Sequence, residues 1–216
     1  MSEITFSDYV KTICTKASQK LHALSRVSNF MTLNQRKTIM NTFILSHFGY
    51  CPLVWMFHNR KFNHRINRLH ERALRIVYKD DKSSFKELLI KDDSFTVHER
   101  NIQTLAIELY KVSYGLSPKI MNLILPLNSD SNYPGENTFK TFNVKTVSWG
   151  ADTLAHLGPK IWSIVPNDMK KIIVKKSLSK FTKKNRKWKP IKCPCRICKT
   201  YVHALGFVTI FVTISS

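Results

Sequence analysis

The stretch Asn63-His-Arg-Ile-Asn-Arg-Leu-His-Glu-Arg-Ala-Leu-Arg-Ile-Val-Tyr78 decides the fold class of this 216-residue chain. Its apolar residues recur at three- and four-residue spacings, which predicts an amphipathic helix. They are Ile66, Leu69, Ala73, Ile76 and Val77. Arginines recur at the same spacings on another face, at Arg65, Arg68, Arg72 and Arg75. The stretch therefore predicts a helix with one buried face and one guanidinium face.

Helical patterns also precede this stretch. Apolar spacing predicts a first helix from Ser7 to about Asn29. Thr32 is a suitable N-cap for a second helix ending near His47. The residues expected to face the core from this second helix are Leu33, Ile39, Met40, Phe43 and Ile44. Aromatic clusters are more often buried than exposed, so Tyr50, Trp55 and Phe57 are also expected in the core.

Capping-box patterns mark two further helix starts. Ser84 with Glu87 opens a short helix, and Thr96 with Glu99 opens a longer one. Partial two-residue alternation between Phe139 and Trp149 fits either a hairpin or extended chain. The sequence therefore predicts a mainly α fold, in which a helical bundle is followed by a smaller α(+β) segment and a basic tail that contains cysteines.

Turn-forming residues cluster between positions 126 and 138, which makes this segment the expected internal linker. We therefore expect a helical region over residues 1–125 and a smaller α(+β) segment over residues 139–187. A basic, Cys-rich tail is expected over residues 188–216.

Charge is unevenly distributed along the chain. Lys plus Arg number 35 and Asp plus Glu number 14, for a net charge of +21. Asp and Glu are absent between Tyr9 and His70, and again from Met169 to the end. A surface selected only for solubility would mix acids with bases throughout. The segregation indicates faces that contact a polyanion, and RNA or DNA is the first candidate.

The candidate nucleic-acid contacts lie in these basic zones: Lys16, Lys20, Arg65, Arg68, Arg72, Arg75, Lys183, Lys184, Arg186, Lys187, Trp188 and Lys189. The final group combines cations with an aromatic ring, as phosphate binding plus base stacking requires. Two alternatives stay open. The four arginines could pair with acids elsewhere in the fold, and the C-terminal group could be a solvated, disordered tail.

The cluster Cys193-Pro-Cys-Arg-Ile-Cys198 offers three thiolates within reach of one tetrahedral ion. His203 follows five residues later and is the natural fourth ligand. The sequence thus predicts a zinc site made by Cys193, Cys195, Cys198 and His203. The alternative is three reduced cysteines in a basic tail.

Enzyme motifs are weak or incomplete. Tyr78-Lys-Asp-Asp81 has the letters of a polymerase metal-binding hairpin, but it follows a helix and leads into a polar turn, so a solvated turn is the better interpretation. His70-Glu71 and His98-Glu99 lack the second histidine of a zinc protease. Glycine loops for nucleotide binding are missing, so no nucleotide cofactor is expected. The chain by itself is not expected to be an enzyme.

Cysteine usage and apolar runs bear on the compartment. Five cysteines form an odd set, and the N-terminal segment lacks a secretory pattern. The apolar run over residues 207–214 is far shorter than the ~20 residues that span a bilayer. We therefore expect an intracellular protein, nuclear or cytoplasmic and not secreted, for which membrane attachment is a weak alternative.

Six segments, in order from about residue 10 to Phe207, resemble LINE-type (non-LTR, jockey-like) retrotransposon reverse transcriptases in their C-terminal third. They are Cys14-Thr-Lys-Ala-Ser-Gln-Lys-Leu-His-Ala-Leu24, Tyr50-Cys-Pro-Leu-Val-Trp-Met-Phe-His58, Asn67-Arg-Leu-His-Glu-Arg-Ala-Leu-Arg-Ile-Val-Tyr78, Asp93-Ser-Phe-Thr-Val-His-Glu-Arg-Asn101, Leu157-Gly-Pro-Lys-Ile-Trp162, and Trp188 with Cys193-Pro-Cys-Arg-Ile-Cys-Lys199.

The resemblance implies a parent protein with an endonuclease and a polymerase core, followed by this region. The family's catalytic aspartates lie in the palm, upstream, and are absent from this chain. What remains would be the helical thumb-like region and a basic segment that hold RNA and target DNA. The sequence therefore predicts a fragment that binds nucleic acid non-specifically. The alternative is an inactive structural remnant that self-associates through surface once packed on the polymerase core.

Overall fold

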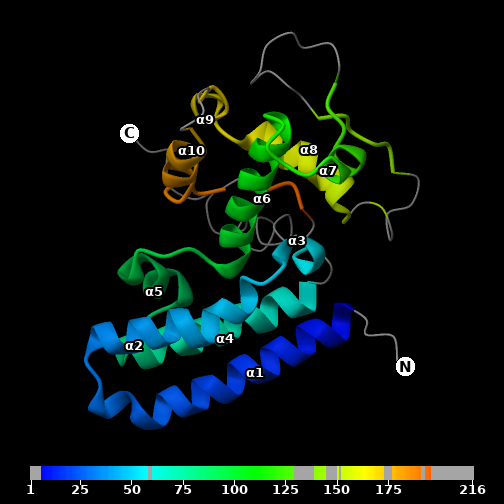
Figure 1. Ribbon diagram of the computed structural model, residues 1–216. Coiled ribbons are helices and arrows are strands. Elements are labelled where there is room, and N and C mark those ends of the chain that lie inside the picture. Colours follow the sequence, from blue (N-terminus) through cyan, green and yellow to red (C-terminus); the bar gives the residue numbers. More distant parts are fainter. Residues whose placement is uncertain are drawn as a thin grey trace, which may run out of the picture. The chain divides into compact units, whose positions relative to one another are not determined.

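The computed structural model describes residues 6–57, 60–128, 139–144, 150, 152–172, 177–190 and 193–195 (Figure 1). These ranges are mainly helical and contain no β-strand, although Leu127 and Phe139 form one isolated antiparallel bridge. The predicted mainly α fold is thereby confirmed. Among the described helices, none combines the length and apolar character that crossing a bilayer requires.

Two compact units make up the chain, and the division falls between Asn101 and Ile102. This point lies inside the helix α6 (Val97–Ser113), so one continuous helix contributes residues to both units. The predicted linker at 126–138 lies mostly outside the described residues, and the boundaries given above stay predictions.

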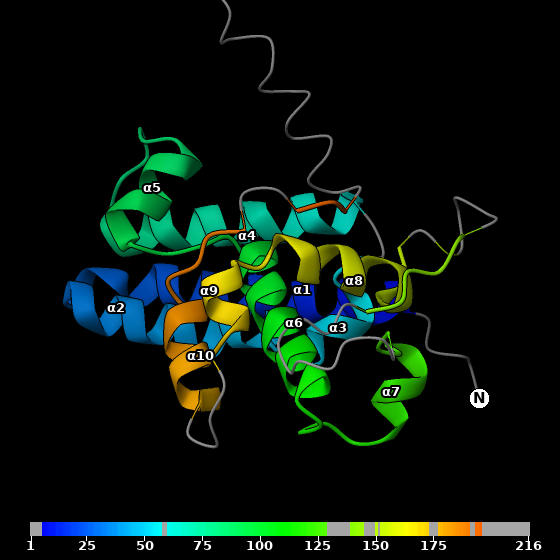
Figure 2. The same ribbon diagram turned by 90° about the horizontal axis from the view of Figure 1, so that it is seen from above.

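The first unit is a set of helices around α4 (Arg60–Tyr78), which lies beside α1 (Phe6–Val27) and α2 (Leu33–Ile39) (Figures 1 and 2). The other elements of this unit are η1 (Ser28–Phe30), η2 (Met40–Ile44), η3 (Leu45–Phe48), α3 (Pro52–Trp55) and α5 (Phe85–Asp92). Fully buried side chains on the long helices include Ala17, Leu21, Ala73 and Leu74. The apolar stripe that the sequence places on α4 thus forms part of the core.

One cation of this unit is part of the core and not of the surface. Arg36 of α2 is buried, and its Nε donates to the carbonyl of Val77 at 2.8 Å. Its Nη1 donates to the carbonyls of Ser28 at 3.2 Å and Met31 at 2.5 Å. Arg36 therefore satisfies backbone acceptors near the ends of α4 and η1, as a buried charge must.

The second predicted helix begins where the sequence places it but does not continue as a regular α-helix. Thr32 and Gln35 form a reciprocal capping box at the start of α2. After Ile39 the chain forms a π-helical turn, η2, and then a 3₁₀ turn, η3. The prediction that Leu33 and Phe43 face the core is wrong, since both side chains are exposed.

The prediction of a buried Tyr50 is also wrong, whereas Trp55 and Phe57 are buried as expected. Cys51 has a left-handed backbone, with φ 43° and ψ 46°, and directs the chain into α3 with Pro52 at its first position. The indole Nε1 of Trp55 donates to the carbonyl of Tyr50 at 3.1 Å. The turn thus uses the backbone of Tyr50 and leaves its ring, which is 68% exposed, in solvent.

The second unit is organised on the greater part of α6, together with α7 (Ile120–Ile124), α8 (Leu154–Ile164), α9 (Asn167–Lys170) and α10 (Ser177–Asn185). Tyr110 of α6 stacks on Phe181 of α10, with ring centroids 4.2 Å apart. Its hydroxyl donates to the carbonyl of Ile172 at 2.7 Å, and the hydroxyl of Tyr114 donates to that of Lys170 at 2.7 Å. These contacts hold α9 and α10 against α6.

Candidate nucleic-acid interface and metal centre

The predicted guanidinium face is present on α4. Arg65, Arg68 and Arg72 are exposed, and their helical spacing places them on one side of the helix. None of the ion pairs found among the described residues includes any of the three. Of the two outcomes that the sequence left open, pairing with acids elsewhere therefore does not occur for these three within the described ranges.

The fourth arginine of the series has a different environment. The Nη2 of Arg75 is 2.7 Å from Oε1 of Glu71, one helical turn away. Its Nη1 donates to the carbonyl of Asp80 at 3.4 Å, and the residue is only partly exposed. Arg75 is therefore engaged in supporting the end of α4, which distinguishes it from the three exposed arginines.

Lys16 and Lys20 lie one helical turn apart on α1, and both are exposed. Neither takes part in an ion pair found within the described part of the chain. On the same helix, Lys11 is paired with Asp8 at 3.0 Å. The first unit thus presents two groups of exposed cations, on α1 and on α4.

The C-terminal basic segment is packed as far as Pro190, so residues 183–190 are not a solvated tail. The amide of Asn185, fully buried at the end of α10, donates to the carbonyl of Gln103 at 2.7 Å. Gln103 in turn donates from Nε2 to the carbonyls of Trp188 at 2.6 Å and Arg186 at 3.4 Å. This exchange of hydrogen bonds fixes the backbone of the segment on α6.

The side chains of this segment differ in how available they are. Lys183, Arg186, Lys187 and Lys189 are exposed, as the sequence predicts for phosphate contacts. Lys184 forms an ion pair with Asp168, and this pair lowers the pKa of the Asp168 carboxyl. Trp188 is half-buried, so only part of its ring surface remains open.

The Tyr-x-Asp-Asp letters at 78–81 belong to a helix-to-helix turn, as the sequence indicates. Asp80 accepts hydrogen bonds from the backbone nitrogens of Lys82 at 3.2 Å and Ser83 at 3.0 Å, and from the Ser83 hydroxyl at 2.9 Å. Lys91 adds an ion pair at 3.1 Å. The hydrogen bonds from Ser83, followed in size of effect by the one from Lys91, hold the pKa of the Asp80 carboxyl far below its ordinary value. This carboxylate therefore acts as a turn-forming group.

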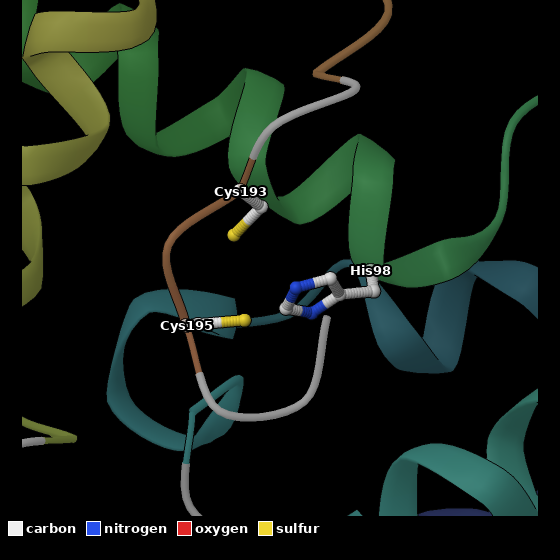
Figure 3. A group of neighbouring side chains, drawn as sticks. All are labelled: His98, Cys193 and Cys195. Atoms are coloured by element: carbon white, nitrogen blue, oxygen red, sulfur yellow. The ribbon is translucent and has the colours of Figure 1, made fainter. Parts of the chain in front are cut away.

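A possible metal-binding group lies beside α6. The imidazole of His98 and the thiols of Cys193 and Cys195 are buried, and their ligand atoms all lie within 4.8 Å of one another. Figure 3 shows the three side chains pointing toward a shared space. Ligands of one tetrahedral zinc ion lie about 3.3–3.8 Å apart, given metal–ligand distances of about 2.0–2.3 Å. The observed separation is compatible with such a site after small shifts.

His98 owes its place to the start of α6. Thr96 and Glu99 form the predicted capping box, with the Glu99 carboxylate accepting from the Thr96 backbone nitrogen at 2.8 Å and Thr96 Oγ1 accepting from Glu99 at 3.2 Å. Glu99 is thus occupied as a helix-capping group, which agrees with the rejection of a protease motif here. The box fixes the first turn of α6, and with it the position of His98.

Two predicted metal ligands fall outside the described residues, namely Cys198 and His203. The sequence did not indicate His98 as a partner for the cysteines. His98 lies far upstream of Cys193 and Cys195, and no motif spacing connects residues so far apart.

Comparisons with known protein families, with curated proteins and with solved structures find no match for the chain.

Proposed function

We propose that this chain is a C-terminal region of a LINE-type non-LTR retrotransposon reverse transcriptase, which acts inside the cell, in the nucleus or the cytoplasm. It binds RNA and DNA non-specifically and has no polymerase activity of its own. The observation that supports this proposal most is the row of exposed arginines on α4, at Arg65, Arg68 and Arg72, without an acidic partner among the described ion pairs. Guanidinium groups in this state are available for bidentate contact with phosphate.

The proposal is tested by the salt dependence of binding. If about six phosphates are neutralised, a plot of log affinity against log salt concentration has a slope of about −5 on duplex DNA and a shallower slope on single strands. Fluorescence anisotropy with labelled oligonucleotides of mixed sequence measures both slopes. Binding that does not change with salt, or no binding at low salt, contradicts the proposal.

Polymerase activity is the competing function within the same family. A primer-extension assay with the purified chain, an RNA template and deoxynucleotides separates the two, and we expect no extended product. Product formation that persists after repeated purification would contradict the proposed role as a binding region.

We further propose that the group at His98, Cys193 and Cys195 holds zinc, because nitrogen and thiolate ligands in a tetrahedral site favour that ion. Cys198 follows Cys195 closely in sequence and is proposed as the fourth ligand. Zinc content measured by mass spectrometry should fall to background for His98→Ala and for Cys195→Ser, and remain near one ion per chain for His203→Ala. Loss in Cys195→Ser and His203→Ala, with zinc retained in His98→Ala, would instead support the ligand set expected from sequence.

A second candidate function is association with another protein surface, either a second copy or the polymerase core. The observation that favours it is α7, which has no buried residue. Leu116, Ile120, Leu123 and Ile124, in and just before this helix, are all exposed. Contiguous exposed apolar side chains of this kind mark interaction sites. Light scattering tests self-association: Ile120→Ser with Leu123→Ser should convert an oligomer into a monomer, whereas a monomeric parent chain would exclude it.

A further inference from the structure

The π-helical turn η2 decides which face of this segment reaches the surface. The Leu45 backbone nitrogen donates to the carbonyl of Met40, a five-residue hydrogen bond that accommodates one residue more than an α-helical turn. Each added residue rotates the following side chains by about 100°. Ile44 and Leu45 are therefore buried, and Phe43 is left 53% exposed.

Two lysines of α1 converge on the same place. The Nζ of Lys20 lies 5.3 Å from the centroid of the Phe43 ring, a cation–π distance. Lys16 precedes it by one turn. The pKa of His47, in the next turn after η2, is lowered by burial and then by the charges of Lys20 and Lys16, so both ammonium groups act at this imidazole.

This surface therefore combines a half-exposed aromatic ring with two cations that lack an acidic partner in the described ion pairs. A broad apolar patch would suit a protein, but here one ring stands among charged and polar groups. A phosphate with an attached base matches both features, because the base can stack on the ring while the phosphate meets the lysines. A base inside a duplex has no free face for such stacking.

We propose that Phe43, Lys16 and Lys20 form a binding site for an unpaired nucleotide of single-stranded RNA or DNA. The base stacks on the Phe43 ring, and the ammonium group of Lys20 leaves the ring for the phosphate, which Lys16 also contacts. Single-strand binding at this site is thereby separate from the duplex binding attributed to the arginines of α4. The inference rests on the proposed function as a nucleic-acid-binding chain.

The test compares Phe43→Ala with Phe43→Trp in the full chain. A labelled oligouridylate and a duplex of equal length serve as probes in anisotropy titrations at one salt concentration. Loss of one stacked base should weaken single-strand binding about 5- to 100-fold, and Phe43→Trp should restore it. Duplex affinity should change less than twofold. Phe30→Ala, a control at a ring that is 90% exposed, should leave both affinities unchanged.

Several results would overturn the inference. Equal losses for Phe43→Ala and Phe30→Ala would mean that ring exposure alone matters. Unchanged single-strand affinity in Phe43→Ala, with normal binding by the parent chain, would refute this site and leave the proposed function intact. Failure of the parent chain to bind either probe would refute the proposed function itself. Anionic lipid vesicles serve as a third probe. If Phe43→Ala keeps its oligonucleotide affinity but loses binding to these vesicles, the surface is assigned to lipid instead.

Photocrosslinking gives a second measurement that does not depend on a variant. An oligonucleotide carrying 5-iodouridine should crosslink to the peptide that contains Phe43, because excited halogenated bases react with an aromatic ring stacked on them. Crosslinks confined to peptides of α4 would contradict the assignment.

Discussion

The basic zone at the start of the chain and the one near its end have similar composition, yet their cations are positioned differently. On α4 the arginines occupy one face of a 19-residue helix whose other face is core. In the second zone, the short helix α10 and the turn after it are fixed by the hydrogen bonds of Asn185 and Gln103. One of its lysines is already paired with an acid. Net charge alone therefore does not reveal how many cations are available to contact phosphate.

The largest expected effect concerns the support of the first zone. Leu74 is fully buried on α4, opposite the exposed arginines. Leu74→Ala should lower the free energy of unfolding by about 2–5 kcal/mol, because it removes buried methyl groups and leaves a cavity. Chemical denaturation followed by circular dichroism measures the loss. Ile90→Ala, at a side chain that is 69% exposed, is the control and should cost far less.

Acid should weaken the first unit through His70. Burial, then the charge of Arg100, lowers the pKa of this imidazole to about 3. The folded state therefore disfavours the proton that the unfolded state accepts below about pH 6.5. Stability from neutral His70 is complete above that pH and falls by about 1.4 kcal/mol for each unit of pH below it, until about pH 3.

Denaturation of the chain at pH 7, 5.5 and 4 measures this dependence. His70→Leu should make it shallower, whereas His64→Leu, at an exposed position of the same helix, should not. An unchanged pH dependence in His70→Leu would show that other groups control acid unfolding.

Removing the exposed arginines measures how much of the duplex binding comes from the first zone. The triple variant Arg65→Gln, Arg68→Gln and Arg72→Gln should reduce the magnitude of the duplex salt slope by about 3, if each residue contacts one phosphate. Anisotropy titrations over a range of salt concentrations measure the change. Arg75→Gln is the matched control, because Arg75 already contacts Glu71. A larger effect from Arg75→Gln than from the triple variant would reverse the ranking of these arginines.

The smallest expected effect is a contrast inside the second zone. Lys183 is exposed and absent from the described ion pairs, whereas Lys184 is paired with Asp168. Lys183→Gln should reduce the salt slope by about 1, and Lys184→Gln by less, because an exposed ion pair already satisfies part of its charge. The same titrations decide it, and equal effects would indicate that the ion pair opens readily when nucleic acid binds.

Features encoded by neighbouring residues could be predicted from the sequence. The N-cap at Thr32 and the capping boxes at Ser84 and Thr96 mark the starts of α2, α5 and α6, since each is made of bonds that span only three residues. The stripe of apolar residues on α4 was equally readable, because helical spacing determines which side chains share a face.

Features that depend on irregular backbone or on distant residues could not. The exposure of Phe43 follows from a π-helical turn, and that of Tyr50 from the left-handed Cys51, and neither has a distinctive sequence pattern. The approach of His98 to Cys193 and Cys195 depends on tertiary packing, which no spacing between them encodes. Only the cysteines of that group could be predicted from the sequence, because they lie close together in it.

The five-residue hydrogen bond at Met40 has a consequence for chain length. Deleting one residue, such as the exposed Asn41, would remove the added residue and let the segment close as an ordinary α-helix, because a π-helical turn is a one-residue insertion. Met40 and Phe48 are buried on either side of the insertion and would keep their faces toward the core, while Phe43 would stay on the outer face, two positions after Met40. A single codon lost here would therefore be absorbed locally, whereas the same loss inside a regular helix would turn every following side chain by about 100°.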